Sequence, residues 1–332
     1  MTGTQPSPSR ILEIASGYWA TGLLAVATQN SLFTLIHDGR RTPAELADKT
    51  GLALRGVQTL LDGLVGLGLL HTQDGVYRNT PETDLYLVEG QLTDISGLAQ
   101  LKLAEMDNLV GRLEVFRAGG PLNNPVAEVA DNPHWENVVT AIAGLSVAAA
   151  QTAASVLSLA DWKNLSILDV GGGSGVFSSV WLQLNPTAQA TQLDWEPINA
   201  IARRLLSNHD LTGRFSCLDG DFHTTELEAA AYDVALYSHI AHQEGPEDNT
   251  AVFAKLRDAL KPGGALIVCD YIVDDDRSGP PFSLLFASEM LLKTNHGGTW
   301  RRADYAAWLI QAGFTDVTFH ATGTPATLAI AR

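Results

Sequence analysis

The feature that most constrains this chain is a glycine-rich turn directly after an apolar run. Residues 166–170 read Ser-Ile-Leu-Asp-Val, and residues 171–175 read Gly-Gly-Gly-Ser-Gly ahead of a helical stretch. Glycines at such a point let the backbone turn sharply and let a ligand lie against it. The spacing is Gly-x-Gly-x-Gly, which differs from the dinucleotide fingerprint Gly-x-Gly-x-x-Gly. This order predicts the first strand, turn and helix of an α/β domain that binds a small molecule.

The chain of 332 residues changes character near residue 160. Residues 11–160 show apolar positions at three- and four-residue spacing, which is typical of helices. From residue 165, short β-branched or apolar runs alternate with helical stretches, which indicates a parallel sheet in an α/β domain. The predicted strands are 166–170, 188–193, 214–218, 232–237, 265–271, 316–320 and 327–331. We therefore expect two domains, at residues 1–160 and 161–332.

The helical part contains a compact unit. Thr42-Pro43-Ala44-Glu45 has the features of a helix start, Gly51 closes that helix, and residues 69–72 and 75–78 indicate a hairpin. Helix, turn, helix and hairpin predict a winged helix. A helix that reads DNA needs several basic or amide side chains, whereas residues 54–69 carry one base and one acid among mostly apolar residues. The unit is therefore expected to contact another subunit.

Composition excludes several classes of protein. Acidic residues outnumber basic ones 37 to 21, giving a net charge of −16, so nucleic acid and anionic membrane surfaces are disfavoured as partners. Hydrophobic residues make up 45% of the chain, which is ordinary for a globular protein. The uncharged stretches 17–36 and 138–160 contain amides or many small residues, which favours buried helices over membrane spans. Two cysteines are typical of a reduced, cytoplasmic setting.

Acids recur at the ends of the first three predicted strands. Asp169 belongs to the first, Asp194 ends the second, and Asp219-Gly220-Asp221-Phe222 ends the third. An acid in the second position can receive both ribose hydroxyls, and a carboxylate beside an aromatic ring can hold an adenine. Three acids would repel a phosphate-rich ligand but suit adenosine joined to a positive centre. The set therefore predicts S-adenosylmethionine as the cofactor.

Five groups of residues carry a resemblance that covers nearly the whole chain. They are Asp169-Val-Gly-Gly-Gly, Asp194, Gly220-Asp221-Phe222, Lys261-Pro-Gly-Gly, and Gly297-Gly298 ahead of Ala312-Gly313-Phe314. With them the chain resembles class I S-adenosylmethionine-dependent methyltransferases of the dimeric small-molecule O-methyltransferase type. The resemblance implies a Rossmann-like, seven-stranded methyltransferase domain with an antiparallel final pair, after a mainly helical winged-helix dimerisation domain. It implies a homodimer that acts on a small molecule.

The same resemblance implies roles for individual residues. Asp169, Gly171 and Gly173 would hold the methionine part of the cofactor. Asp194 would hold the ribose, with Trp195 next to it in the cofactor site. Asp221 and Phe222 would hold the adenine.

The catalytic segment departs from the family pattern. In the family a His-Asp-Trp triplet follows the fourth strand, and its histidine deprotonates a phenol. Here His242 stands at the position of the base, while Gln243 and Glu244 replace the other two residues. A family glutamate that orients the base follows the late glycine pair, where this chain has Trp300 soon after. The sequence therefore indicates a base without its assisting acids.

A second histidine, His296, stands immediately before the late glycine pair. His242 and His296, with the amide of Gln243 nearby, could hold a divalent metal such as Zn or Fe with open positions. Such a metal can chelate a 2-oxo acid and stabilise the enolate formed on losing the adjacent C–H proton. This resembles the bacterial 2-oxo-acid C-methyltransferases. His239 is expected to pack beneath the end of the sheet.

Two main functions stay open at this point. The favoured one is metal-assisted methylation of the β carbon of a small 2-oxo acid in secondary metabolism, with His242, Gln243 and His296 at the catalytic site. The alternative is a metal-independent O-methyltransferase of a phenolic or hydroxylated metabolite, with His242 as general base. A relative that binds the cofactor without methylating is a third interpretation, because the assisting acids are missing from their usual places.

Overall fold

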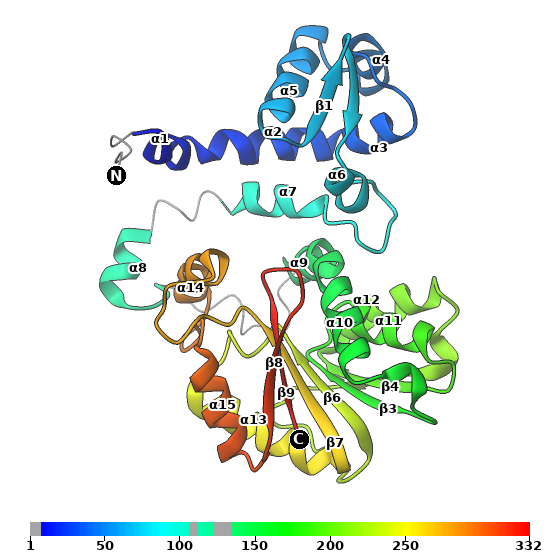
Figure 1. The fold of residues 1–332 in the computed structure, drawn as a ribbon, viewed down its shortest axis with the longest axis vertical. Helices are drawn as coiled ribbons and strands as arrows, with labels where there is room; N and C mark the ends of the chain where they lie inside the picture. Colours follow the sequence, from blue (N-terminus) through cyan, green and yellow to red (C-terminus); the bar gives the residue numbers. More distant parts are fainter. Residues whose placement is uncertain (1–7, 106–111, 123–133) are drawn as a thin grey trace, which may run out of the picture. The chain divides into compact units, whose positions relative to one another are not determined.

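The computed structural model describes residues 8–105, 112–122 and 134–332. By internal contacts the chain forms two compact units, one of residues 1–109 with 140–144 and the other of residues 110–139 with 145–332 (Figure 1). The domain boundary predicted at residue 160 differs from this division, because the described residues 112–122, 134–139 and 145–160 belong to the second unit. Within residues 145–160, the backbone oxygen of Ala150 accepts a hydrogen bond of 2.8 Å from the buried Trp181 indole.

The first unit contains the predicted winged helix. Its elements are α1 Ser9–Ala15, α2 Gly17–Gln29, α3 Leu32–His37, α4 Pro43–Thr50, α5 Leu54–Gly66, β1 Leu70–Gln73, β2 Val76–Asn79, α6 Pro81–Tyr86 and α7 Gly97–Ala104. Strands β1 and β2 pair antiparallel. A capping box starts α4, since Thr42 and Glu45 each accept from the other's backbone N–H. Gly51 ends that helix with φ +74°.

Helix α5 is a packing element of this unit. It buries Val57, Leu60, Leu61 and Leu64, which lie on one face at helical spacing. They join a core that includes Phe33 and other buried residues of α3, α4 and the hairpin. The apolar side chains of α5 are thus buried in the core of its own unit.

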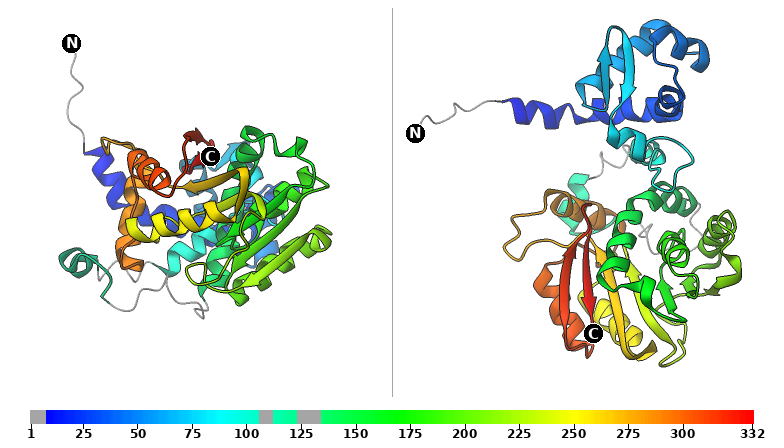
Figure 2. Two further views of the ribbon diagram at one scale, coloured as in Figure 1. Left: turned by 90° about the horizontal axis from the view of Figure 1, so that it is seen from below. Right: turned by 45° about the vertical axis from the view of Figure 1, so that its right-hand side comes forward.

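The second unit contains a seven-stranded sheet with helices on both faces (Figures 1 and 2). Its strands are β3 Ser166–Val170, β4 Gln189–Asp194, β5 Phe215–Asp219, β6 Tyr232–Ser238, β7 Leu260–Asp270, β8 Val317–Ala321 and β9 Thr327–Ala331. Its helices are α8 Arg112–Ala118, most of α9 His134–Ile142, α10 Val147–Val156, α11 Val176–Leu184, α12 Glu196–Ser207, α13 Pro246–Ala259, α14 Pro281–Lys293 and α15 Arg302–Gln311, with 3-10 turns η4 Leu159–Asp161 and η5 Thr212–Arg214 and the second half of η3 Ala143–Ser146.

The sheet order is β5-β4-β3-β6-β7-β9-β8. Strands β3 to β7 are parallel, and β9 runs antiparallel to both β7 and β8. The predicted seven strands and antiparallel final pair are confirmed. Because parallel strands end at one edge, the carboxyl ends of β3, β4, β5, β6 and β7 meet there.

The opposite edge of the sheet holds one of the motifs that carried the resemblance. Lys261 donates to Asp233 Oδ2 at 3.0 Å and to Ser166 Oγ at 2.9 Å. These three residues lie near the amino ends of β7, β6 and β3. The Lys261-Pro-Gly-Gly segment therefore ties the sheet together at the edge away from the glycine turn.

Within the part of the chain that the structure describes, one apolar helical stretch passes the length and composition test for a membrane span. It is Trp135–Val156, with 44% of its most apolar window buried. The pair Ser9–Ala15 and Gly17–Gln29 passes only if its 47° bend is disregarded. Core helices of soluble proteins meet the same criteria, so the expectation that no membrane is bound stays a prediction.

Asn199 on α12 fixes the ends of two strands. It is fully buried. Its amide donates to the backbone oxygens of Asp194 and Leu218, each at 2.9 Å, and to Asp219 Oδ1 at 2.7 Å. Its own oxygen accepts from Gln192 at 3.1 Å. One side chain therefore joins the carboxyl ends of β4 and β5, where the predicted cofactor acids stand.

We expect Asn199→Ala to lower the free energy of unfolding by about 2–4 kcal/mol, because it leaves several buried polar groups unpaired. Urea unfolding followed by tryptophan fluorescence measures this change. Asn208→Ala, at the exposed end of the same helix, is the control and should change stability by less than about 0.5 kcal/mol. Equal effects of the two variants would show that Asn199 does not carry this role.

Candidate active site

Asp169 lies in β3, directly before the glycine turn, and is buried. Ser178 donates to its Oδ2 at 2.7 Å, while its Oδ1 is buried without a hydrogen-bond partner among the described residues. Burial raises the pKa of Asp169 to about 7; the Ser178 hydrogen bond opposes the rise and the nearby Asp194 charge adds to it. A buried carboxyl group with a free oxygen favours a positive ligand.

Asp194 ends β4 and braces the glycine turn. Its Oδ2 accepts from the Gly173 amide at 3.0 Å and its Oδ1 from the Trp195 amide at 2.8 Å. Burial raises the pKa of Asp194 to about 6, although both amides lower it. Gly173 has φ +58°, a conformation that favours glycine. The Trp195 ring is half-buried, 6.2 Å from the ring of Trp135.

The glycine turn also touches the loop after β6. Gly171 has φ +64°, and a Cβ there would come within 2.6 Å of the Ile240 side chain. Glycine is therefore required at this point both for the backbone and for space. The consequence is that the turn lies directly against the segment that carries His242.

Asp221 and Phe222 lie just beyond β5. Asp221 Oδ1 accepts from the His223 amide at 2.8 Å. The Phe222 ring lies 4.4 Å from the His223 ring and 5.7 Å from that of Tyr237. Lys255 donates to the backbone oxygen of Phe222 at 2.8 Å, which fixes this segment against α13.

The structure thus brings the predicted cofactor residues to neighbouring strand ends. The buried Asp169 and the half-buried Asp194 both have raised pKa values. With a free oxygen on Asp169 and a half-buried aromatic ring, they suit S-adenosylmethionine, which carries positive groups, ribose hydroxyls and an adenine. The described residues therefore fit this cofactor.

His242, in the loop after β6, is bound to a buried acid. Its Nδ1 lies 2.6 Å from Asp270 Oδ1, and its backbone amide donates to Asp270 Oδ2 at 2.9 Å. Tyr271 N donates to Asp270 Oδ1 at 2.7 Å. Burial by itself would raise the pKa of Asp270, but the charge and hydrogen bond of His242 outweigh it and the pKa is lowered.

This pair fixes the tautomer of the imidazole. An ionised carboxylate only accepts hydrogen bonds, so Nδ1 of neutral His242 carries the hydrogen. Nε2 then has the free lone pair and is the basic atom.

The prediction that His242 lacks an assisting acid is wrong. Asp270 ends β7 and follows His242 by 28 residues. It was missed because separation along the chain says nothing about distance across a sheet. The available signal was an acid at the end of a fifth parallel strand, in the same position as the strand-end acids of β4 and β5.

The structure does not join His296 to His242 in a ligand set. His296 is exposed, in the loop after α14. Across the described ranges, one group of three His, Cys, Asp or Glu residues has potential metal-ligand atoms within 4.8 Å of one another, and it consists of His239, His242 and Asp270. Gln243 donates to the backbone oxygen of His239 at 3.4 Å. The late glycine pair contacts the loop through its backbone, since Gly298 N donates to His242 O at 2.8 Å.

Aromatic rings form a wall beside the base. The His242 ring is stacked 5.9 Å from Tyr271 and meets Phe286 edge-on at 4.9 Å. Phe282 lies 4.9 Å from Tyr271 and is 45% exposed. Such a wall suits a flat apolar substrate.

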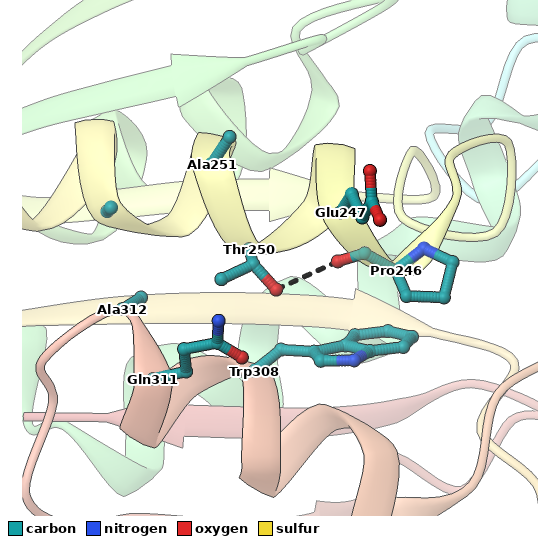
Figure 3. Close-up of a pocket in the computed structure, with 8 residues that line it drawn as sticks. Pro246, Glu247, Thr250, Ala251, Trp308, Gln311 and Ala312 are labelled. Carbon is teal, nitrogen blue, oxygen red and sulfur yellow. Dashed lines mark hydrogen bonds between the residues drawn. The ribbon is translucent and has the colours of Figure 1, made fainter.

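A separate surface groove of about 410 Å³ lies between α13 and α15 (Figure 3). Thr250, Trp308 and Gln311 are among its lining residues, and none of the predicted site residues is. The groove therefore lies outside the site described above.

The chain matches two known domain families. Residues 129–315 match the O-methyltransferase domain, and residues 12–89 match the O-methyltransferase dimerisation domain. The chain belongs to the O-methyltransferase family. It is an S-adenosylmethionine-dependent enzyme, as the sequence predicted.

Individual relatives align with this O-methyltransferase almost end to end. It is 30% identical to the tetracenomycin polyketide synthesis 8-O-methyl transferase of Streptomyces glaucescens, over 98% of this chain and 96% of the relative. It is 31% identical to the 3-hydroxy-5-methyl-1-naphthoate 3-O-methyltransferase of Streptomyces sahachiroi, over 95% and 93%. Human N-acetylserotonin methyltransferase, solved in complex with S-adenosylmethionine, shares the fold with a TM-score of 0.84 at 22% identity, over 100% and 99%.

We expect the methyltransferase to bind S-adenosylmethionine more tightly as pH rises from 5 to 8. A positive ligand favours the ionised forms of Asp169 and Asp194, so binding releases protons where these groups are still protonated. The affinity should rise by up to about tenfold per pH unit for each proton released. Calorimetry in buffers of different ionisation enthalpy measures both affinity and proton release.

Asp194→Asn should weaken binding and flatten this pH profile, while the exposed Asp258→Asn should change neither. The pH dependence of stability has the opposite sign. In the folded protein the pKa values of Asp169 and Asp194 lie above 3.8, their value in the unfolded chain. Without cofactor, the stability that these two carboxyl groups contribute is therefore fully present below pH 3.8. It is lost as pH rises through about 6 to 7. A pH-independent affinity would contradict the assignment of these acids to the cofactor.

Proposed function

We propose that this enzyme methylates a hydroxyl group of a small aromatic metabolite, with His242 as general base and Asp270 as the acid that orients it. The 2.6 Å contact between His242 Nδ1 and Asp270 carries the proposal, because it leaves Nε2 free to take a proton. Relatives named for a polyketide and a naphthoate support an aromatic substrate. The aromatic wall of Tyr271, Phe282 and Phe286 supports the same class.

Each residue has a stated part in the reaction. S-adenosylmethionine, when bound, supplies an electrophilic methyl group whose leaving sulfur becomes a neutral thioether. Asp169 and Asp194, with the glycine turn, would hold the cofactor, with Asp221 and Phe222 at its adenine. His242 Nε2 takes the hydroxyl proton as the substrate oxygen forms its bond to the methyl carbon. Asp270 stabilises the imidazolium that results.

We propose a hydroxyl oxygen, and not a carbon atom, as the methylated atom because an imidazole is a weak base. An ordinary imidazole has a pKa of about 6.5 and a phenol of about 10, so proton transfer between them is accessible, whereas a carbon-bound proton is far less acidic. The sequence favours methylation of a 2-oxo acid only because a base without an assisting acid needs a metal to remove a carbon-bound proton. Asp270 removes that reason, and the comparisons support neither the 2-oxo acid nor a metal.

Asp270 is also poorly available to a metal. Its two oxygens already accept from the His242 ring, the His242 amide and the Tyr271 amide. We therefore propose that a divalent metal is not needed, and that the enzyme works in the cytoplasm with S-adenosylmethionine alone.

His242→Ala should lower kcat for a phenol by about 10²–10⁴-fold, the usual contribution of a general base. Its residual activity should rise with pH toward the pKa of the phenol, and a more acidic nitrophenol should be less affected. Initial rates of methyl transfer measure this, with the exposed His209→Ala as control. Asp270→Asn should also lower kcat, because the amide can hold the wrong tautomer.

Two results would contradict this assignment. One is a His242→Ala variant that methylates the un-ionised phenol at the wild-type rate while binding S-adenosylmethionine normally. The other is loss of wild-type activity on chelation with recovery on adding Zn²⁺ or Fe²⁺, which would restore the metal hypothesis.

We also propose that the homodimer forms through α1 and α2. These helices expose apolar side chains, among them Ile11, Ile14, Tyr18 and Trp19, and the dimerisation match begins at residue 12. An exposed apolar surface of this kind marks a protein interface.

Trp19→Glu combined with Ile14→Glu should convert the dimer to monomer, because charges would be buried at the interface. Light scattering after size-exclusion chromatography measures the mass. Leu54→Glu, on α5 with a comparable 56% exposure, should leave the dimer intact. A double variant that stays dimeric would reject this interface.

A further inference from the structure

His239 stands at the end of β6 in an unusual conformation. Its φ is +57°, in the left-handed region that residues other than glycine seldom adopt. Its amide donates to Cys269 O at 2.8 Å, so the pairing of β6 with β7 holds it there. Strain of this kind persists mainly where the surrounding structure imposes it, often at functional sites.

The His239 side chain lies beside the base. Its ring is 4.8 Å from Tyr271 and 6.2 Å from His242. One nitrogen of each imidazole and one oxygen of Asp270 lie within 4.8 Å of one another. His239 Nδ1 is buried and has no hydrogen-bond partner among the residues that the structure describes. A buried nitrogen left unpaired next to the reacting groups calls for a partner from outside the chain.

Its protonation state limits what His239 can do. Burial lowers its pKa to about 4, although the charge of Asp270 opposes this. The ring is therefore neutral at physiological pH, with one donor and one acceptor nitrogen. A group of this kind is too weak a base to share the role of His242 but can form a neutral hydrogen bond. A metal bound by His239 is also disfavoured, because the neighbouring Asp270 oxygens already accept hydrogen bonds and are poorly available as further ligands.

The His239 and His242 rings lie 6.2 Å apart between centroids, and a hydrogen bond from each ring spans about 2.7–3.2 Å, so the two rings can each bind one of two neighbouring oxygens on one substrate. We propose that His239 determines specificity by binding a second substrate oxygen, a hydroxyl or a carbonyl, next to the hydroxyl that is methylated. The enzyme then prefers aromatic substrates with neighbouring oxygens over simple phenols. This inference rests on the proposed O-methylation at His242.

The test compares matched pairs of substrates at one pH. They are 2,3-dihydroxynaphthalene against 2-naphthol, and 1,8-dihydroxynaphthalene against 1-naphthol. The wild type should show a kcat/KM about tenfold higher for at least one dioxygenated compound than for its partner. Two equivalent hydroxyls account for a factor of about two, and the rest lies within the range for one hydrogen bond.

His239→Phe keeps a ring against Tyr271 but has no nitrogen, and should bring this ratio down to about two while leaving kcat/KM for the naphthol within about threefold. His239→Asn keeps a donor and an acceptor and tolerates the left-handed backbone, so it should retain part of the preference. The exposed His209→Phe should change nothing. Substrate acidity is the same for every variant, so a change in the ratio reports on His239 itself. Unchanged S-adenosylmethionine affinity shows that the variants fold.

Other outcomes overturn one proposal or the other. If the wild type methylates none of the four compounds, O-methylation of phenols is wrong. If it methylates them and His239→Phe leaves the ratio unchanged, or lowers both rates equally without rescue by Asn, the specificity role is wrong and O-methylation stands. If His239→Phe loses both activity and bound Zn²⁺ or Fe²⁺ that the wild type contains, His239 is a metal ligand and the proposal fails.

Discussion

The parallel pairing of β6 with β7 is the constraint on which the active site depends. Its register sets Ser238 opposite Cys269, so the next residues of both strands emerge side by side at the carboxyl edge. Asp270 is the last residue of β7, and the loop after β6 turns back over it. The backbone amide and the ring of His242 can then both bind one carboxylate. A shift of one residue would turn Asp270 to the other face of the sheet.

The same edge concentrates acidic groups at an electrostatic cost. Asp169 and Asp194 are held where burial disfavours their charge, and each stands near the other. Such an arrangement is unfavourable in the free protein but complementary to a positive ligand. Asp270 differs, since His242 compensates its burial. The edge therefore holds two kinds of acid: Asp169 and Asp194, whose pKa values burial raises, and Asp270, whose pKa is lowered by His242.

Glycine and asparagine set the spacing between these groups. Gly171 allows the turn to lie against Ile240, which brings the cofactor side of the edge to the catalytic loop. Asn199 joins the carboxyl ends of β4 and β5 through hydrogen bonds to the backbone of both strands. Neither residue has a reactive group, yet they keep the strand ends at fixed separation. Positioning of this kind supplies much of the rate in a displacement reaction, where the reacting atoms must be in line.

The sequence by itself determined the strands, the winged helix and the cofactor. Alternating patterns report which residues are buried along an element. The glycine turn, Asp194 and Asp221 lie in short segments that follow β3, β4 and β5, and these three strands are neighbours in the sheet in the same order as along the chain. Tertiary structure alone decided which acid assists His242. The residues expected there, near Gln243 and Trp300, are absent, and Asp270 reaches the base only because two strands pair in parallel across 28 residues. The buried, unpaired nitrogen of His239 is likewise a property of packing, because burial and the lack of a partner depend on every neighbour of the ring.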